Sequence, residues 1–134
     1  MRVTSKYCNK LFSGDLFYKE VNDIIEITYV INGRKCVARG ENCFDTLTKL
    51  RSELEKDNIT LLCNGAAINV YPYGMMRDVS TCELAYKMEI GKPAKWDDVV
   101  NIFEYDPSLR IATVSEQKQY YSEWLTSLGC DNAR

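Results

Sequence analysis

The chain has 134 residues, of which 46% are hydrophobic and 27% charged, and its formal net charge is −2. These values are typical of one ordinary globular domain and exclude a disordered or collagen-like chain. No apolar stretch approaches the ~20 residues that a helix needs to cross a bilayer, and the polar N-terminal segment is unlike a secretory signal. The slight excess of acids disfavours nucleic acid as the main partner, because such proteins gain affinity by neutralising phosphates with basic side chains.

The six cysteines and the complete lack of histidine restrict the chemistry that the chain can support. No pair of cysteines has C-x-x-C spacing, so the sequence predicts neither a zinc site nor any other metal or cofactor site. Reduced thiols in a cytoplasmic protein are favoured over a disulfide framework. Any catalysis would have to use carboxylates, lysine, tyrosine or cysteine, since the usual acid/base group near neutral pH is missing.

The N-terminal third predicts a loose segment followed by a three-stranded antiparallel meander. We expect residues 1–14 to be loose. Residues 16–21 are apolar and aromatic, and apolar and polar residues then alternate over 24–31 and 34–39, with Ile25, Ile27, Tyr29 and Ile31 on one face. Asn22-Asp23 and Asn32-Gly33 separate these strands, and such pairs accept the positive φ of tight hairpin turns.

A helix is predicted after Gly40, with Asn42 as its N-cap. Its apolar residues recur at nearly helical spacing, and its charged residues are expected to face water. The apolar stripe consists of Phe44, Leu47, Leu50 and Leu54, and the charged set of Lys49, Arg51, Glu53, Glu55 and Lys56.

The C-terminal half adds short strands and a second helix. Strands are expected over 59–63 and 66–71, joined by a tight hairpin at Asn64-Gly65, and then over 84–90 and 99–105. Thr113 and Glu116 form a capping box for a helix that buries Trp124. The sequence therefore predicts a single α+β domain over 1–134. Its mostly antiparallel sheet has about six or seven strands, and two helices pack on one face.

The segment 71–81 lacks clear periodicity and is the first candidate for a binding site. Tyr71, Tyr73 and Arg77 could contact a partner, because tyrosine offers a large contact area at little entropic cost. The alternative is that the segment packs onto the sheet, with Met75 and Met76 in the core. The sequence alone favours packing onto the sheet over contact with a partner.

The segment 96–106 is the second candidate, because four acids and no base occur between residues 97 and 106, with aromatic residues interspersed. Aromatic side chains can anchor a basic partner while the acids steer it. The proposed contact residues here are Trp96, Asp97, Asp98, Glu104, Tyr105 and Asp106. The alternative is that Asp97 and Asp98 cap a turn while Glu104 points to solvent. Cys63 is predicted to be a buried structural thiol, because no adjacent cation would activate it.

Four stretches resemble a group of small bacterial proteins. They are Val70-Tyr71-Pro72-Tyr73-Gly74-Met75, Ala85-Tyr86-Lys87, Val100-Asn101-Ile102-Phe103, and Ala112 to Gln117 with Trp124-Leu125. The chain resembles, over about its C-terminal half, uncharacterised proteins associated with polymorphic-toxin and contact-dependent-inhibition immunity. Tyr73 and Asp78-Val79 depart from the smaller residues typical there. The resemblance implies a non-enzymatic inhibitor of a toxin, and it carries no catalytic signature.

The sequence thus supports a non-enzymatic cytoplasmic binding protein of the immunity or antitoxin type. Its expected partner is a protein, such as a toxin domain with a basic nuclease groove; nucleic acid, membrane and cofactors are not expected as partners. The alternative is a small enzyme in which Arg77, Asp78 and a further carboxylate or tyrosine converge near the 71–81 segment. A third option is a structural subunit whose sheet edge pairs with another copy.

Overall fold

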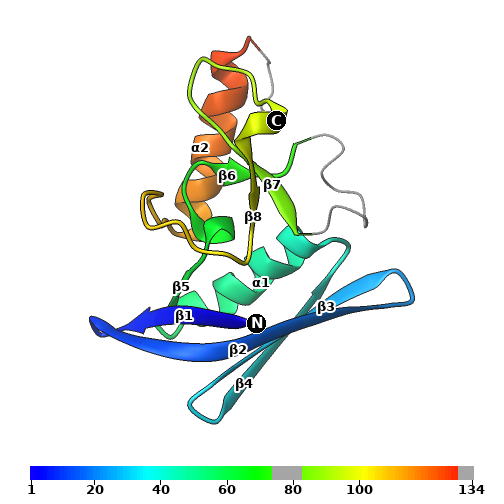
Figure 1. The fold of residues 1–134 in the computed structure, drawn as a ribbon, viewed down its shortest axis with the longest axis vertical. Coiled ribbons are helices and arrows are strands. Elements are labelled where there is room, and N and C mark those ends of the chain that lie inside the picture. The colour runs from blue at the N-terminus through cyan, green and yellow to red at the C-terminus, as the bar shows by residue number, and fades with distance from the viewer. Residues whose placement is uncertain (74–82, 130–134) are drawn as a thin grey trace.

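The computed structural model describes residues 1–73 and 83–129, and its strands form two antiparallel sheets (Figure 1). The five-stranded sheet has the order β4-β3-β2-β1-β5, and the three-stranded sheet has the order β6-β7-β8. The first contains β1 (Arg2–Tyr7), β2 (Lys10–Val21), β3 (Ile24–Ile31), β4 (Arg34–Gly40) and β5 (Thr60–Leu62). The second contains β6 (Val70–Tyr71), β7 (Leu84–Lys87) and β8 (Val99–Asn101).

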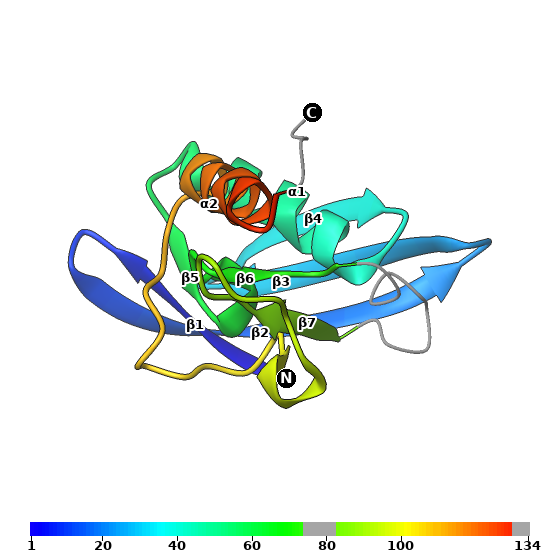
Figure 2. The same ribbon diagram turned by 90° about the horizontal axis from the view of Figure 1, so that it is seen from above.

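Two α-helices complete this framework, α1 (Cys43–Glu55) and α2 (Val114–Ser127), with short 3-10 helices at η1 (Asn64–Ala66) and η4 (Trp96–Asp98). α1 packs on one face of the five-stranded sheet, and α2 lies beside α1 and the three-stranded sheet (Figures 1 and 2). The predicted α+β class is confirmed. The strands are divided between two sheets, whereas a single sheet of six or seven strands was expected.

The predicted meander is present as β2, β3 and β4. Asn22, Asp23 and Asn32 adopt positive φ in the two hairpin turns, as their residue types predict. The expected alternation is also confirmed, because the side chains of Ile25, Ile27, Tyr29 and Ile31 are all buried toward α1. Local residue preferences therefore determine this part of the fold.

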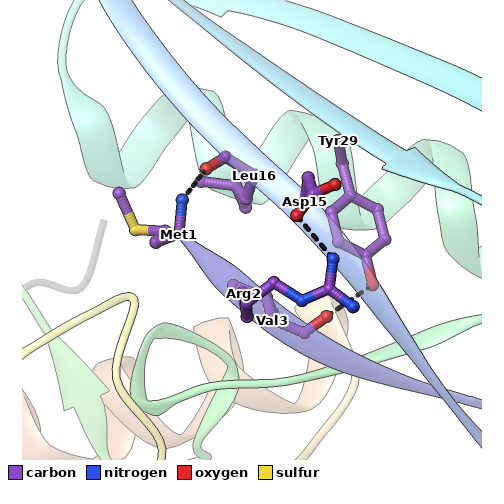
Figure 3. A network of polar contacts seen from close by, with 6 residues as sticks. All are labelled: Met1, Arg2, Val3, Asp15, Leu16 and Tyr29. Atoms are coloured by element: carbon purple, nitrogen blue, oxygen red, sulfur yellow. Dashed lines mark hydrogen bonds and ion pairs between the residues drawn. The ribbon is translucent and has the colours of Figure 1, made fainter.

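The N-terminal segment is part of the five-stranded sheet, and the expectation that residues 1–14 are loose is wrong. β1 pairs with both β2 and β5. Figure 3 shows the contacts that fix it: the Met1 ammonium donates to the Leu16 carbonyl at 2.8 Å, and the Tyr29 hydroxyl donates to the Val3 carbonyl at 2.9 Å. Only a glycine fits at residue 14, because a Cβ there would lie 2.7 Å from the Tyr29 ring. These partners are distant in sequence, so the polar composition of β1 gave no sign of them.

The first helix begins as predicted, since the Asn42 side chain accepts a hydrogen bond from the Asp45 backbone N–H at 2.9 Å. The predicted apolar stripe is buried, with Leu47, Leu50 and Leu54 fully so. Arg51, however, was expected to face water and is only 3% exposed. Glu55 is also turned inward, where its carboxylate accepts from the Val114 backbone N–H at the start of α2.

Arg51 takes part in a buried hydrogen-bond network that joins α1 to α2. Its guanidinium donates to the Gln117 side-chain oxygen at 2.6 Å and to the carbonyls of Gly65 and Ala112 at 3.3 and 2.8 Å. Gln117, which is 1% exposed, donates in turn to the carbonyls of Gly65, Ala67 and Val70. Burial lowers the pKa of Arg51. The network therefore links the helix on the five-stranded sheet to the first strand of the three-stranded sheet.

The pair Asn64-Gly65 begins the 3-10 helix η1, and the predicted hairpin at this position is wrong. β5 pairs with β1 and has no pairing with β6. The Asn64 side chain donates to the Asn101 carbonyl at 3.0 Å and accepts from the Asp106 backbone N–H at 2.8 Å. A Cβ on Gly65 would lie 2.5 Å from the Leu47 side chain. The pair is thus used for close packing against α1 and the segment after β8.

The second helix has the predicted capping box, in which Thr113 and Glu116 each bond the other's backbone N–H. Trp124 is fully buried, and its ring N–H donates to the Lys92 carbonyl at 2.9 Å. Its ring stacks near Tyr121, with the centroids 6.0 Å apart. Within the described ranges, no helix is both long and apolar enough to cross a membrane.

We predict that Trp124→Ala lowers the free energy of unfolding by about 3–5 kcal/mol, because it removes a buried indole and leaves the Lys92 carbonyl without its partner. Urea unfolding followed by circular dichroism measures the change. Ile90→Ala is the matched control, since this side chain is 46% exposed, and it should change stability by less than about 0.5 kcal/mol. A Trp124→Ala variant as stable as this control would contradict the packing of α2.

Candidate functional site

Trp96 is the most exposed large hydrophobic side chain in the described part of the chain, at 66%. It begins η4, and its ring lies 6.4 Å from the ring of Tyr86 on β7, at an angle of 50°. Asp97 is exposed next to it. The Asp98 carboxylate accepts a hydrogen bond from the Lys95 backbone N–H at 3.1 Å, so Asp98 fixes the turn, which was the alternative reading for this acid.

Lysines surround the two acids of η4. A hollow of about 400 Å³ lies here between the start of β8, the end of β7 and α2. Its charged lining residues are Lys87, Glu89, Lys92, Lys95, Asp97 and Asp98. Three cations and three carboxylates face one space, so the local charge is balanced even though the linear segment is acidic.

Glu104 and Tyr105 lie at the other end of β8 and are both exposed, Tyr105 by 46%. Asp106 has a structural role instead. Its carboxylate accepts from the Ser108 hydroxyl at 2.7 Å and from the Ser108 backbone N–H at 2.9 Å, and these bonds hold the pKa of Asp106 below its usual value. Of the contact residues expected at this end of β8, Glu104 and Tyr105 are exposed and Asp106 is partly exposed.

A second hollow, of about 470 Å³, lies between the start of β1 and the segment 101–105. On its wall the Glu83 carboxylate accepts hydrogen bonds from the Tyr18 hydroxyl and, at 2.8 Å, from the Asn101 side chain. The Tyr18 ring stacks on Phe103, with centroids 5.5 Å apart. Partial burial and the bond to Glu83 raise the pKa of Tyr18 to about 12. This cluster joins residues 65 positions apart in the chain, so the sequence carried no signal for it.

The structure separates the predicted contact residues into three places. Asp97 and Asp98 line the hollow with the lysines, and Trp96 precedes them on η4, whereas Glu104 and Tyr105 line the hollow beside β1. Tyr71 and Tyr73 pack on α2: the Tyr71 ring stacks on Tyr121 at 3.9 Å, and the Tyr73 ring meets Trp124 edge-on at 5.3 Å. Tyr73 remains 42% exposed.

The proposed roles of Arg77, Asp78, Met75 and Met76 concern positions outside the described residues.

The described cysteines are in two states. Cys8, Cys36 and Cys63 are free thiols, whereas Cys43 is disulfide-bonded, so the expectation of reduced thiols is wrong for Cys43. Cys63 is fully buried, as predicted, and burial raises the pKa of its thiol to about 11. Among the residues that the structure describes, no three His, Cys, Asp or Glu side chains are grouped as metal ligands.

Comparison of the sequence with protein-family models and with curated proteins gives no match. The functional interpretation therefore depends on the exposed side chains and on the chemistry of the two hollows.

Tyr18 gives a pH-dependent prediction. Its pKa in the folded chain, about 12, is above the ordinary value of 10.0, so the unfolded chain loses this proton first as the pH rises. The stabilisation from the Tyr18–Glu83 bond should be complete below pH 10 and lost between pH 10 and 12. We expect Tyr18→Phe to make the alkaline decline in stability shallower, measured by urea unfolding at a series of pH values.

The exposed Tyr105 is the control for this experiment. Tyr105→Phe should leave the slope of stability against pH unchanged over the same interval. Equal slopes for wild type and Tyr18→Phe would show that Tyr18 keeps no raised pKa in the folded chain.

Proposed function

We propose that the chain is a non-enzymatic binding protein of the immunity type, which acts in the cytoplasm by blocking a partner toxin. The observation that carries this proposal is the exposure of Trp96 and Tyr105, which are 66% and 46% accessible while standing next to Asp97 and Glu104. Exposed tryptophan and tyrosine are the side chains that most often supply binding energy at protein interfaces. A partner that covered these rings would remove a large apolar area from water.

The charges beside the rings indicate which part of the surface favours a basic partner. Glu104 and Glu83 both line the hollow beside β1, and both cations there are already engaged: Arg2 pairs with Asp15 at 2.6 Å, and the Met1 ammonium donates to the Leu16 carbonyl at 2.8 Å. The hollow at η4 is balanced by lysines. We therefore assign the electrostatic steering of a cationic toxin groove to Glu104, and we assign the main apolar contact to Trp96.

The expected acidic surface is narrower than the sequence predicted. If the toxin is a nuclease, exposed carboxylates could occupy the positions of substrate phosphates in its groove. Asp97 and Glu104 are available for this role, whereas Asp98 and Asp106 are engaged in turns. Binding should weaken with salt only modestly, since few carboxylates take part.

A cytoplasmic location is part of the proposal, and the free and the disulfide-bonded cysteines point to opposite redox compartments. The free thiols of Cys8, Cys36 and Cys63 favour a reducing compartment, whereas a disulfide such as that of Cys43 is more common in oxidising ones.

The Tyr18–Glu83–Asn101 cluster is the observation that favours an enzyme as the second candidate. A phenol and a carboxylate are hydrogen-bonded beside a hollow of about 470 Å³. The phenol keeps its proton to about pH 12, and each Glu83 oxygen already accepts one bond. The phenol is therefore a poor general base at neutral pH, and the exposed rings of Trp96 and Tyr105 make the binding protein the better-supported function.

The test is co-expression with the toxin domain encoded by the neighbouring gene, followed by measurement of the Kd by biolayer interferometry. We expect wild type to restore growth and to bind tightly. Trp96→Ser should weaken binding by about tenfold or more, and Glu104→Lys should slow association at low salt. Both variants should unfold within about 0.5 kcal/mol of wild type, because both side chains are exposed.

Lys118→Glu, an exposed change on α2, is the control for effects of net charge. It should leave growth and Kd unchanged. Failure of wild type to bind the neighbouring gene product at micromolar concentration would overturn the proposal, and so would full binding by both Trp96→Ser and Glu104→Lys.

A further inference from the structure

The face of the five-stranded sheet that is turned away from α1, here called the outer face, is covered by no element of 1–73 or 83–129 (Figure 1). Residues paired directly across antiparallel strands share a face. Phe17 on the central strand β2 pairs with Thr28, which pairs with Val37, so these three residues form the middle row of the outer face. Phe17 is 53% exposed.

Apolar side chains extend along this face in both directions from Phe17. Leu11 is 65% exposed, Val21 is 49% exposed and Ile24 is 40% exposed. All three share the outer face, because Leu11 and Val21 lie an even number of positions from Phe17 along β2 and Ile24 pairs with Val21. These exposed apolar side chains lie at the centre of the face, at Phe17, and at its two ends, with polar residues between them along β2.

The outer face is also basic, in contrast to the chain as a whole. Strand pairing places five cations and two carboxylates on it: Arg2, Lys6, Lys19, Lys35 and Arg39, with Asp15 and Glu26. These groups sum to +3, whereas the net charge of the chain is −2; Arg2, at the edge of the face, also lines the hollow beside β1 with Glu83 and Glu104. A charge count along the sequence does not reveal this excess. Successive residues of a strand point to opposite faces, so basic residues of the outer face are interleaved with residues of the other face.

Both carboxylates are already neutralised by cations of the same face. Asp15 pairs with Arg2 at 2.6 Å, and Glu26 pairs with Arg39 at 2.8 Å and with Lys19 at 3.7 Å. Lys6 and Lys35 have no acidic partner among the described residues. The two lysines are therefore the cations that remain available to an incoming partner.

We propose that the outer face docks an acidic protein surface, with Phe17 inserted at the centre of the contact and Lys6 and Lys35 pairing with carboxylates at its rim. An apolar centre surrounded by charged residues is the usual anatomy of a protein interface. The proposal goes beyond the toxin-binding surface at Trp96 and Glu104, because it uses different residues and a partner of the opposite charge.

Two other occupants fit the face less well. A second copy docked face to face would bring two surfaces of the same positive sign together. A single-stranded polynucleotide would stack on only one aromatic ring, because Phe17 is the one aromatic side chain that strands β1 to β4 place on the outer face. An acidic protein surface satisfies both the charge and the apolar centre.

The test uses a fluorescein-labelled peptide of about 16 residues in which glutamate alternates with leucine and phenylalanine, and a matched peptide with lysine in place of glutamate. Fluorescence anisotropy should show that wild type binds the glutamate peptide and not the lysine peptide. Phe17→Ser and Lys35→Glu should each weaken binding by about fivefold or more. Two variants are used so that a folding defect in one leaves the other informative.

The controls separate this inference from the proposed function. Trp96→Ser and Lys118→Glu should bind the glutamate peptide as wild type does, since neither side chain lies on the outer face. The inference is overturned if wild type fails to bind the glutamate peptide, or if it binds both peptides equally. It is also overturned if an oligothymidylate binds more tightly through Phe17 and Lys35, or if sedimentation shows a dimer that Phe17→Ser dissociates.

Discussion

The architecture depends on a buried cation that has carbonyl oxygens and one carboxamide as its partners. Arg51 donates to Gln117, Gly65 and Ala112, and Gln117 donates to three further carbonyls. No salt bridge in the described part of the chain includes Arg51. A buried charge is tolerated only when its donors are satisfied, so the backbone of η1, the start of β6 and α2 must be held in fixed positions around it. The exposed rings of Trp96 and Tyr105 lie at the two ends of β8, which is part of the three-stranded sheet that this network joins to α1.

Local sequence signals predicted the elements whose causes are local. Asn42 and the Thr113–Glu116 capping box begin the two helices as expected, and the turns at Asn22-Asp23 and Asn32-Gly33 have the predicted backbone. The predictions that were wrong concern residues whose partners are distant in the sequence. Arg51 occupies a position on α1 that helical periodicity assigns to solvent, and its partner Gln117 is 66 residues away. Asn64-Gly65 resembles a hairpin turn, but its hydrogen bonds go to residues 101 and 106.

The difference between local and distant causes also explains how much of the function could be predicted from the sequence. The exposure of Trp96, Glu104 and Tyr105 agrees with the pattern of alternating aromatic and acidic residues. The lysines that balance Asp97, and the Tyr18 hydroxyl that donates to Glu83, come from other parts of the chain. The basic outer face was missed for a different reason, since its charges are local but interleaved with residues of the other face. Charge must be counted by sheet face, because a count along the chain averages two surfaces.

The most direct test of this account is a double-mutant cycle between Arg51 and Gln117, measured by urea unfolding of wild type, Arg51→Met, Gln117→Leu and the double variant. If the two side chains form one network, each single variant leaves buried polar groups without partners and costs about 3 kcal/mol or more. The double variant should then be more stable than the sum of the two losses predicts, by about 1–3 kcal/mol. Losses that add to within about 0.5 kcal/mol would contradict the account, because they would show that the two residues stabilise the fold independently.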